Sequence, residues 1–305
     1  MRQRIYRYFI KVLSSFLLFI LFISILYISI RVIPGDPITA LYGETRPDPN
    51  VRSSLEKMLG LDKPLYIQIL SYISRVFRGD LGRSIYYGIP VSVLIINRLF
   101  SSAILATVST IVMILLCISA IYLEFVLRRY RNVLKVISAL SASMPTLGWG
   151  SLLIAISIYL GIPIGFGSIV GPLITLSIVG FGFFYRYLRA SIINIFNEHY
   201  IEFYHTMGFS QQRIVFIAMR IALPKFLTAL LYRAGLIMTS AIVVETLFQY
   251  PGMGSLFSLA LQSRDYPVLI GWGVTAIAIS IALYIAIDIL HSVLDPRVGS
   301  YESLH

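Results

Sequence analysis

The stretch from Val136 to Tyr185 contains no charged residue, and several other long runs are nearly as apolar. A helix that crosses a bilayer needs about 20 mostly apolar residues, so this stretch is long enough for two crossings. Glycines and prolines between Gly161 and Pro172 predict a tight turn in its middle. Only 13% of the residues are charged, roughly half the share in a soluble domain. The chain is therefore predicted to be an all-α integral membrane protein.

Six transmembrane helices are expected. Besides the two in the charge-free stretch, the predicted spans are Val12 to Ile30, Leu99 to Leu123, Phe226 to Phe248 and Val268 to Ile287. A signal peptide is the competing interpretation of the first run. That run is too long for the apolar core of a typical signal peptide, and no small-residue cleavage site follows it. We therefore interpret it as a helix.

Lysines and arginines gather in three segments that flank the predicted spans. These segments are the N-terminus, the loop after the second span and the loop between the fourth and fifth spans, with Arg2, Arg4, Arg7, Lys11, Arg128, Arg129, Arg131, Lys135, Arg186, Arg189, Arg213, Arg220 and Lys225. The protein is predicted to lie in the plasma membrane. Because basic residues favour the cytoplasmic side, both termini are predicted to be cytoplasmic. The net charge of +11 thus indicates membrane flanks rather than nucleic-acid binding.

Two long connecting segments are predicted to contain helices. In the external segment after the first span, one helix is expected from Asp48 and Pro49 to Gly60, and a second from Pro64 to just before Gly79. The second helix could cover the mouth of a pathway or lie on the membrane as an interfacial helix without a substrate role.

The cytoplasmic loop 190–223 is predicted to form a helix–glycine–helix element. His199 to Met207 reads as a short helix that ends at Gly208, and Ser210 can cap the helix that follows. Pro224 marks the start of the fifth span. Nothing in the lipid needs such an element, so it favours a docking surface for a soluble partner; an ordinary capped loop is the alternative.

Residue patterns typical of enzymes are missing from the sequence. It has no phosphate-binding loop and no Gly-Lys pair, its four histidines are scattered, and its one cysteine, Cys117, lies in an apolar run. We therefore expect no catalytic residues, no metal site and no cofactor bound by this chain. Arg233, Glu245 and Asp288 fall within or near spans, where end-of-span placement or pairing within a helix is favoured over contact with a solute.

A series of short motifs follows the order found in one transporter family. They are Pro34-Gly35-Asp36-Pro37, Leu59-Gly60-Leu61-Asp62-Lys63-Pro64-Leu65-Tyr66, Gly79-Asp80-Leu81-Gly82-Arg83-Ser84, Ser143-Met144-Pro145, Val244-Glu245-Thr246-Leu247-Phe248, Tyr250-Pro251-Gly252-Met253-Gly254, Arg264-Asp265-Tyr266-Pro267 and Asp295-Pro296-Arg297. Together they resemble the permease subunits of ABC importers for dipeptides, oligopeptides and nickel, across nearly the whole chain.

The resemblance extends to the cytoplasmic loop, with departures. In the family, a Glu-Ala-Ala sequence is followed after three residues by a glycine and later by Leu-Pro. Here Glu202 and Gly208 have that separation, but Phe203 and Tyr204 replace the alanines, and the segment up to Pro224 is one or two residues short. The resemblance implies that Glu202, Phe203, Tyr204, Gly208 and Ser210 form a coupling loop that docks on an ATPase.

The resemblance also implies the architecture and the partners. The fold would be that of a type I ABC importer permease, divided into residues 1–95 (first span and external loop), 96–291 (transmembrane core with the coupling loop) and a cytoplasmic tail, 292–305. The implied partners are a second homologous permease, two cytoplasmic ATP-binding subunits that use the ATP, and an extracytoplasmic solute-binding protein.

The implied function is to form half of a pathway for di- and oligopeptides. The same architecture could import oligosaccharides or nickel, because the motifs do not encode the solute. A secondary carrier would require paired charges within the membrane, and a structural scaffold would not require the spacing of Glu202 and Gly208.

Overall fold

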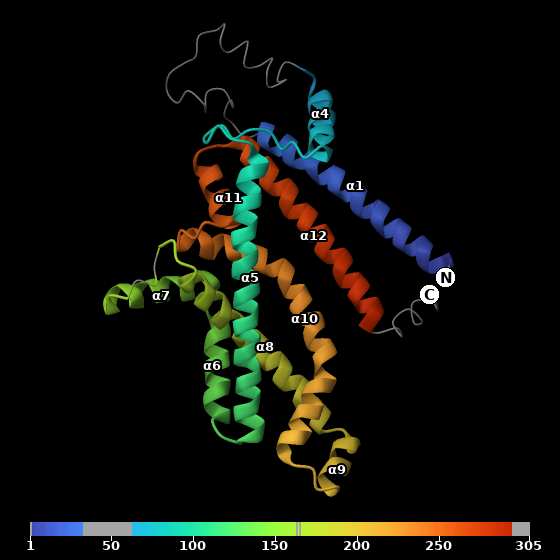
Figure 1. Cartoon of the computed structure of the whole chain (residues 1–305), viewed down its shortest axis with the longest axis vertical. Coiled ribbons are helices and arrows are strands. Elements are labelled where there is room, and N and C mark those ends of the chain that lie inside the picture. Colours follow the sequence, from blue (N-terminus) through green and yellow to red (C-terminus); the bar gives the residue numbers. More distant parts are fainter. Residues whose placement is uncertain (1, 33–62, 163, 165, 295–305) are drawn as a thin grey trace. The chain divides into compact units, whose positions relative to one another are not determined.

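The computed structural model describes residues 2–32, 63–162, 164 and 166–294, and every regular element in that part of the chain is a helix (Figure 1). The helices are α1 (Arg2–Val32), α4 (Leu65–Phe77), α5 (Val91–Ile121), α6 (Arg131–Ser143), α7 (Thr146–Leu160), α8 (Val170–Phe196), α9 (His199–Thr206), α10 (Gln211–Leu247), α11 (Met253–Gln262) and α12 (Tyr266–Leu294). A π-helical segment, η1 (Tyr122–Val126), continues α5. The all-helical fold class is confirmed.

Three helical segments in the described residues are long and apolar enough to cross a bilayer. They are α5 continued by η1 (Val91–Val126), α8 (Val170–Phe196) and the first part of α12 (Tyr266–Ala286). A fourth is obtained if α6 and α7 are counted together as one broken span. In α1, the apolar segment is shorter and covers Leu13–Ser29.

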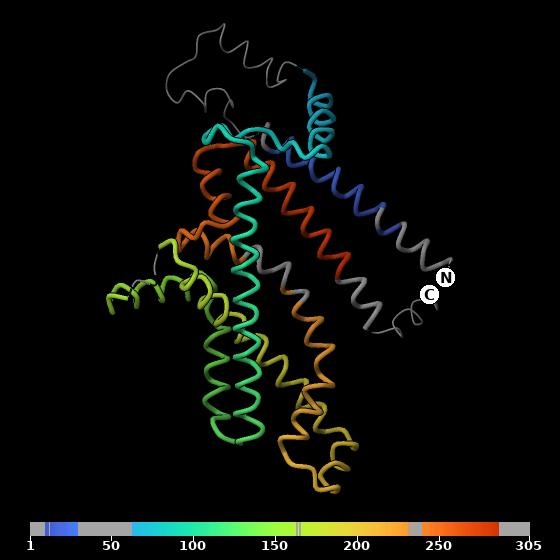
Figure 2. The backbone as a smooth tube through the Cα atoms, in the orientation of Figure 1, coloured from blue at the N-terminus to red at the C-terminus, as the bar shows by residue number. Residues whose placement is uncertain are grey.

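The third predicted span is broken in two rather than one straight helix. The chain bends by 106° between α6 and α7, and Figure 2 traces this change of direction. Met144 is extended, and Pro145 has no N–H to continue the helical hydrogen bonds. The indole Nε1 of Trp149 donates to the carbonyl oxygen of Ser141 at 3.1 Å and so bridges the break.

The start of the fifth span also differs from the expectation. Pro224 lies inside α10, which runs without interruption from Gln211 to Leu247. Ser210 occupies the N-cap position, but its side chain makes no capping hydrogen bond. The segment between the fifth and sixth predicted spans contains the helix α11. A proline in a membrane helix is tolerated because neighbouring groups satisfy the freed carbonyl, so Pro224 could not define a helix boundary.

The chain divides into two compact units, Met1–Leu99 with Leu256–Ala282, and Phe100–Ser255 with Leu283–His305. In the first unit, α4 packs against α1. The rings of Phe77 and Phe16 lie 5.7 Å apart, and the Tyr27 hydroxyl donates to the side-chain oxygen of Gln68 at 3.2 Å. The prediction of a helix that begins after Pro64 and ends before Gly79 is therefore confirmed.

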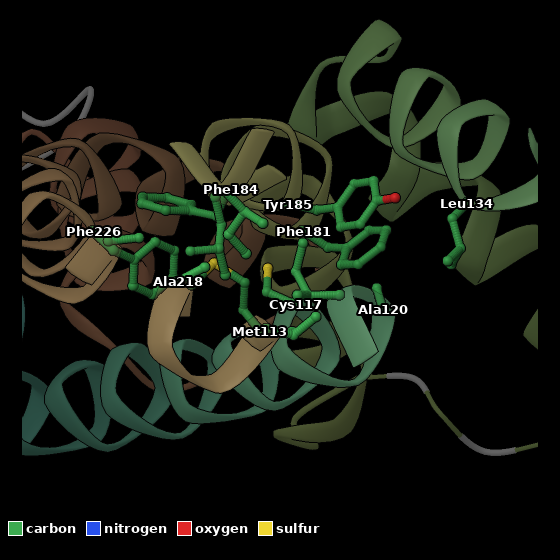
Figure 3. Close-up of a cluster of buried hydrophobic side chains, with 14 residues drawn as sticks. Met113, Cys117, Ala120, Leu134, Phe181, Phe184, Tyr185, Ala218 and Phe226 are labelled. Carbon is green, nitrogen blue, oxygen red and sulfur yellow. The ribbon is translucent and has the colours of Figure 1, made fainter. Parts of the chain in front are cut away.

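The second unit is built around α8, which packs against α6, α7 and α10. Gly182 allows α6 to approach closely, because a Cβ at this position would lie 2.7 Å from the backbone nitrogen of Ala142. Such contacts between small residues drive helix association in lipid. Figure 3 shows the adjoining apolar cluster, where Phe181 and Tyr185 stack and Phe184 meets Phe226 edge to face.

The three-part division into residues 1–95, 96–291 and 292–305 stays a prediction. Residues 295–305 of the predicted tail lie outside the described residues, as do the first motif, Pro34 to Pro37, and the helix expected from Asp48 to Gly60.

Candidate functional site

The predicted docking element has the local structure expected from the sequence. α9 begins at His199, and the chain turns at Gly208 before α10 starts at Gln211. Gly208 has a φ of +75°, and no heavy atom lies within 4 Å of the position its Cβ would take. Its role is therefore conformational rather than steric, since L-residues with a side chain are strained at this φ.

The side chains of α9 divide into a buried anchor and an exposed face. Ile201 is buried, while Glu202 is exposed and the ring of Phe203 is 59% exposed. Tyr204 is half-buried, and the centroid of its ring lies 5.3 Å from that of the Phe209 ring. The aromatic pair that replaces two alanines thus has two roles: Phe203 presents apolar surface outward, and Tyr204 stiffens the turn around Gly208.

A buried carboxylate lies close to this element, where α5 ends. Glu124 in η1 is 4% exposed and accepts a hydrogen bond from the Tyr185 hydroxyl at 2.5 Å. The Arg189 Nε donates to both carboxylate oxygens, at 2.8 and 3.1 Å. Arg131 adds a weaker contact at 3.5 Å from a side chain that is 62% exposed. Charge-assisted bonds of this kind join η1 firmly to α8.

The start of α10 is hydrogen-bonded to η1, the segment that contains Glu124. The Gln211 Nε2 donates to the carbonyl oxygen of Phe125 at 3.2 Å, directly after Glu124. Hydrogen bonds therefore connect the start of α10 to η1, and Glu124 connects η1 to α8. The sequence alone does not reveal this network. The available signal was an acidic residue inside a segment rich in arginine, with Arg189 on the next long helix.

The motif from Val244 to Gly254 forms a carboxylate cap for α11. Glu245 is fully buried; its carboxylate accepts from the Ser102 hydroxyl at 2.6 Å and from the backbone N–H of Gly254 at 2.6 Å. A Cβ on Gly252 would lie 2.3 Å from that carboxylate, and a Cβ on Gly254 would lie 2.3 Å from the Cα of Ile242. Both glycines are thus required by close packing, and Pro251 lies in the turn between them and α10.

The Tyr250 hydroxyl donates to the carbonyl oxygen of Ser101 at 3.2 Å and fixes the same turn to α5. Burial, with a smaller contribution from the Glu245 carboxylate, raises the pKa of Tyr250 above its ordinary value.

The two motifs of the first unit also meet. Asp265 is 1% exposed and accepts hydrogen bonds from the Ser84 hydroxyl at 2.5 Å and from the backbone N–H groups of Ile85 and Tyr86, both at 3.1 Å. The loop that follows Gly79 is thereby fastened to the start of α12. Arg264 has a positive φ of 53°, and Tyr266 and Pro267 begin α12. These contacts hold the loop and the start of α12 together.

Within the described part of the chain, no group of three His, Cys, Asp or Glu side chains could hold a metal ion. Arg233, which the sequence placed within the fifth span, is buried in α10 beside a cavity.

Comparison with known sequences gives two family matches. Residues 117–300, more than half of the chain, match the family described as the binding-protein-dependent transport system inner membrane component. The chain belongs to this family. Residues 5–88 match the family described as the N-terminal part of a membrane component of such systems. The resemblance inferred from the motifs is confirmed: this family member is a multi-pass membrane protein and a permease subunit, a transport component for which no catalytic function is indicated.

Individual relatives cover most of the chain. The oligopeptide transport system permease protein AppB of Bacillus subtilis (strain 168) is 28% identical over 293 residues, which cover 89% of this chain and 92% of AppB. The dipeptide transport system permease protein DppB of Escherichia coli (strain K12) is 29% identical over 310 residues, which cover 88% and 91%. The glutathione transport system permease protein GsiC of Escherichia coli O6:H1 is 29% identical over 304 residues, which cover 95% and 98%.

Proposed function

We propose that this chain forms half of the solute pathway in an ATP-driven importer of dipeptides and oligopeptides. The proposal rests mainly on the relatives, whose names refer to transport of oligopeptides, dipeptides and glutathione, and the two family matches agree with it. These solutes share one chemistry, a short chain of amide-linked residues. The partners would be a second homologous permease, two cytoplasmic ATP-binding subunits and an extracytoplasmic solute-binding protein.

The proposed topology has six spans, formed by α1, α5, the α6–α7 pair, α8, α10 and α12, with both termini in the cytoplasm. The asymmetry of lysine and arginine supports this orientation. It puts α4 outside, and it puts α9 and the Gly208 turn on the cytoplasmic side. The α6–α7 pair would cross as a broken helix, an arrangement that membrane proteins tolerate where the freed backbone is buried in protein.

The proposed mechanism couples ATP binding in the partners to a switch between two helix packings. The coupling segment would be Glu202, Phe203, Tyr204, Gly208 and Ser210, of which Glu202 and Phe203 are exposed. Motion of this segment would pass from Gln211 to η1 and then through Glu124 to Arg189 and Tyr185 on α8. A bonded route of this kind supports a rigid-body response of α5, α8 and α10 rather than a local one.

The solute class can be tested by reconstituting the complete importer in liposomes with its binding protein. We expect ATP-dependent uptake of labelled di- and tripeptides, and no uptake of maltotriose or nickel. Uptake of either of the latter in preference to peptides would replace the proposed solute while keeping the importer architecture. ATP-independent uptake that follows a proton gradient would instead indicate a secondary carrier.

A second expectation concerns the nucleotide. Because the sequence lacks a phosphate-binding loop, the purified subunit alone should neither bind nor hydrolyse ATP. Isothermal titration with ATP should show no saturable binding until the ATP-binding subunits are added. Tight binding by the subunit alone would contradict the proposed division of labour.

A further inference from the structure

α10 carries a buried guanidinium that the proposed coupling mechanism does not use. Arg233 is 9% exposed and lies in the second unit, where α10 packs against α8. Its Nη2 donates to the carbonyl oxygen of Leu176 at 2.9 Å, and its Nη1 contacts the sulfur of Met113. The guanidinium carbon lies 5.3 Å from the centre of the Phe184 ring, which places the charge over an aromatic face.

The packing leaves room for this side chain at one position on α8. A Cβ on Gly180 would lie 1.8 Å from Nη1 of Arg233 and 2.5 Å from its guanidinium carbon. Only glycine therefore allows the guanidinium to occupy its present place. An arginine whose side chain merely extended toward an aqueous surface would not need a glycine at this position of the neighbouring helix.

The guanidinium borders a cavity of about 470 Å³. Most of the lining is apolar, contributed by Val179, Phe183 and Ala229 among others, and it also includes the hydroxyl-bearing residues Thr146, Tyr187, Thr228 and Ser240. This volume falls within the range of about 300–1,000 Å³ typical of small-ligand pockets, which are mainly apolar with a few convergent polar groups.

Among the described side chains, no carboxylate forms an ion pair with Arg233. The buried acids of the same unit make other contacts, Glu124 with Arg189 and Tyr185, and Glu245 with Ser102 and the N–H of Gly254. A cation within a membrane span is costly and is usually matched by an anion or placed on a substrate path. The contacts to Leu176, Met113 and Phe184 involve neutral groups, so they stabilise the cation without neutralising its charge.

We infer that the cavity beside Arg233 binds the carboxylate end of the solute during its passage through the permease. This inference rests on the proposed function, because every peptide with a free C-terminus supplies one carboxylate. The planar guanidinium can hold a carboxylate with two parallel hydrogen bonds, while the apolar lining accepts side chains of varied structure. Selectivity for the peptide terminus and tolerance of its side chains would then come from one pocket.

The test compares a tripeptide with its C-terminal amide, in the complete importer reconstituted with its binding protein saturated by either peptide. The variants are Arg233→Gln and Arg233→Lys, with Arg78→Gln as the control for loss of an exposed arginine. Uptake is normalised to the assembled complex. We expect Arg233→Gln to lower uptake of the free acid roughly tenfold to a hundredfold, as for loss of a charge-assisted hydrogen bond. Uptake of the amide should change little, so the ratio of acid uptake to amide uptake should fall toward one. Arg233→Lys should retain part of the preference for the acid.

The outcomes separate this inference from the proposed function. If Arg233→Gln lowers both peptides equally, the arginine serves packing or pairs with a partner subunit or lipid, and the inference is overturned while peptide import stands. If the unaltered importer transports neither peptide, both are overturned. Should Arg233→Gln fail to assemble, Gly180→Ala displaces the same guanidinium without removing it, and a preserved acid-to-amide ratio in that variant would equally overturn the inference.

Discussion

At the scale of single residues, Glu245 is the fully buried carboxylate of the family motifs, and it makes two short hydrogen bonds. It joins Ser102 of α5 to the first turn of α11 through hydrogen bonds to the Ser102 hydroxyl and the Gly254 N–H. A carboxylate that accepts backbone N–H groups at a helix N-terminus is stabilised both by hydrogen bonds and by the helix dipole. The motif therefore reads as a structural cap rather than as a solute site.

Gly252→Ala tests this interpretation. The added Cβ would lie 2.3 Å from the carboxylate and must displace it from Ser102 and Gly254. Leaving buried polar groups unsatisfied costs about 1–3 kcal/mol, so the purified importer should unfold at a lower temperature, and amides of α11 should exchange faster with deuterium. Gly148→Ala is the matched control, because its Cβ would lie 3.2 Å from the flexible end of Met144 and at ordinary contact distances of 3.7 and 3.8 Å from Pro145. Equal Tm values for the two variants would contradict the cap.

At the scale of elements, the turn between α9 and α10 depends on the backbone of Gly208. Valine at a φ of +75° is strained by roughly 1–2 kcal/mol or more, whereas asparagine tolerates this region. If the segment couples to an ATPase, Gly208→Val should lower uptake and solute-stimulated ATP hydrolysis together, at normal membrane abundance. Gly208→Asn should be close to the unaltered protein, and Glu202→Ala should act in the same direction as the valine variant but more mildly.

A structural loop predicts a different pattern for the same variants. Abundance would fall, while uptake per assembled complex would stay unchanged. The deciding measurement is thus uptake normalised to inserted complex, and full normalised activity in Gly208→Val would remove this turn from the mechanism.

The Glu124 network makes a separate prediction about how η1 is held to α8. Glu124→Gln preserves the shape but removes the charge that Arg189 requires, and breaking a buried ion pair costs about 3–5 kcal/mol. We expect a marked loss of Tm and of coupled ATP hydrolysis. Arg131→Ala removes only a contact at 3.5 Å from an exposed side chain and should cost less than about 1 kcal/mol. Comparable losses in both variants would show that burial of the carboxylate is not what matters.

The sequence predicts those elements that are formed by interactions between residues close together in the chain. α4 and the α9–Gly208 turn depend on local signals, a proline start and glycine stops, and the sequence predicts both. The break at Pro145 and the passage of α10 through Pro224 use the same residue type with opposite results. What distinguishes them is tertiary packing, such as the bond from Trp149 to Ser141, which no local pattern encodes.

The candidate site shows the same limit. Sequence spacing identified Glu202 and Gly208, because a motif on adjacent turns is local. It could not bring together Glu124 with Arg189, or Arg233 with Gly180, because these pairs are 65 and 53 positions apart and meet only when α8 packs against η1 and α10. The motif glycines Gly252 and Gly254 were recognised by resemblance, but their physical reason, close approach to Glu245 and Ile242, requires coordinates.

At the scale of the whole molecule, the proposed orientation follows from charge asymmetry alone and can be tested directly. Translocating a loop rich in lysine and arginine is disfavoured, so the three basic segments should remain in the cytoplasm and residues near Ser53 should lie outside. The chain has one cysteine, Cys117, and it is buried, so background labelling by an impermeant thiol reagent should be low. Ser53→Cys and Ser300→Cys form a matched pair with the same new group on opposite predicted sides. In intact cells Ser53→Cys should be labelled and Ser300→Cys should not, and permeabilising the membrane should make Ser300→Cys reactive. The reverse pattern would place α9 and the Gly208 turn outside the cell, beyond the reach of any cytoplasmic ATPase.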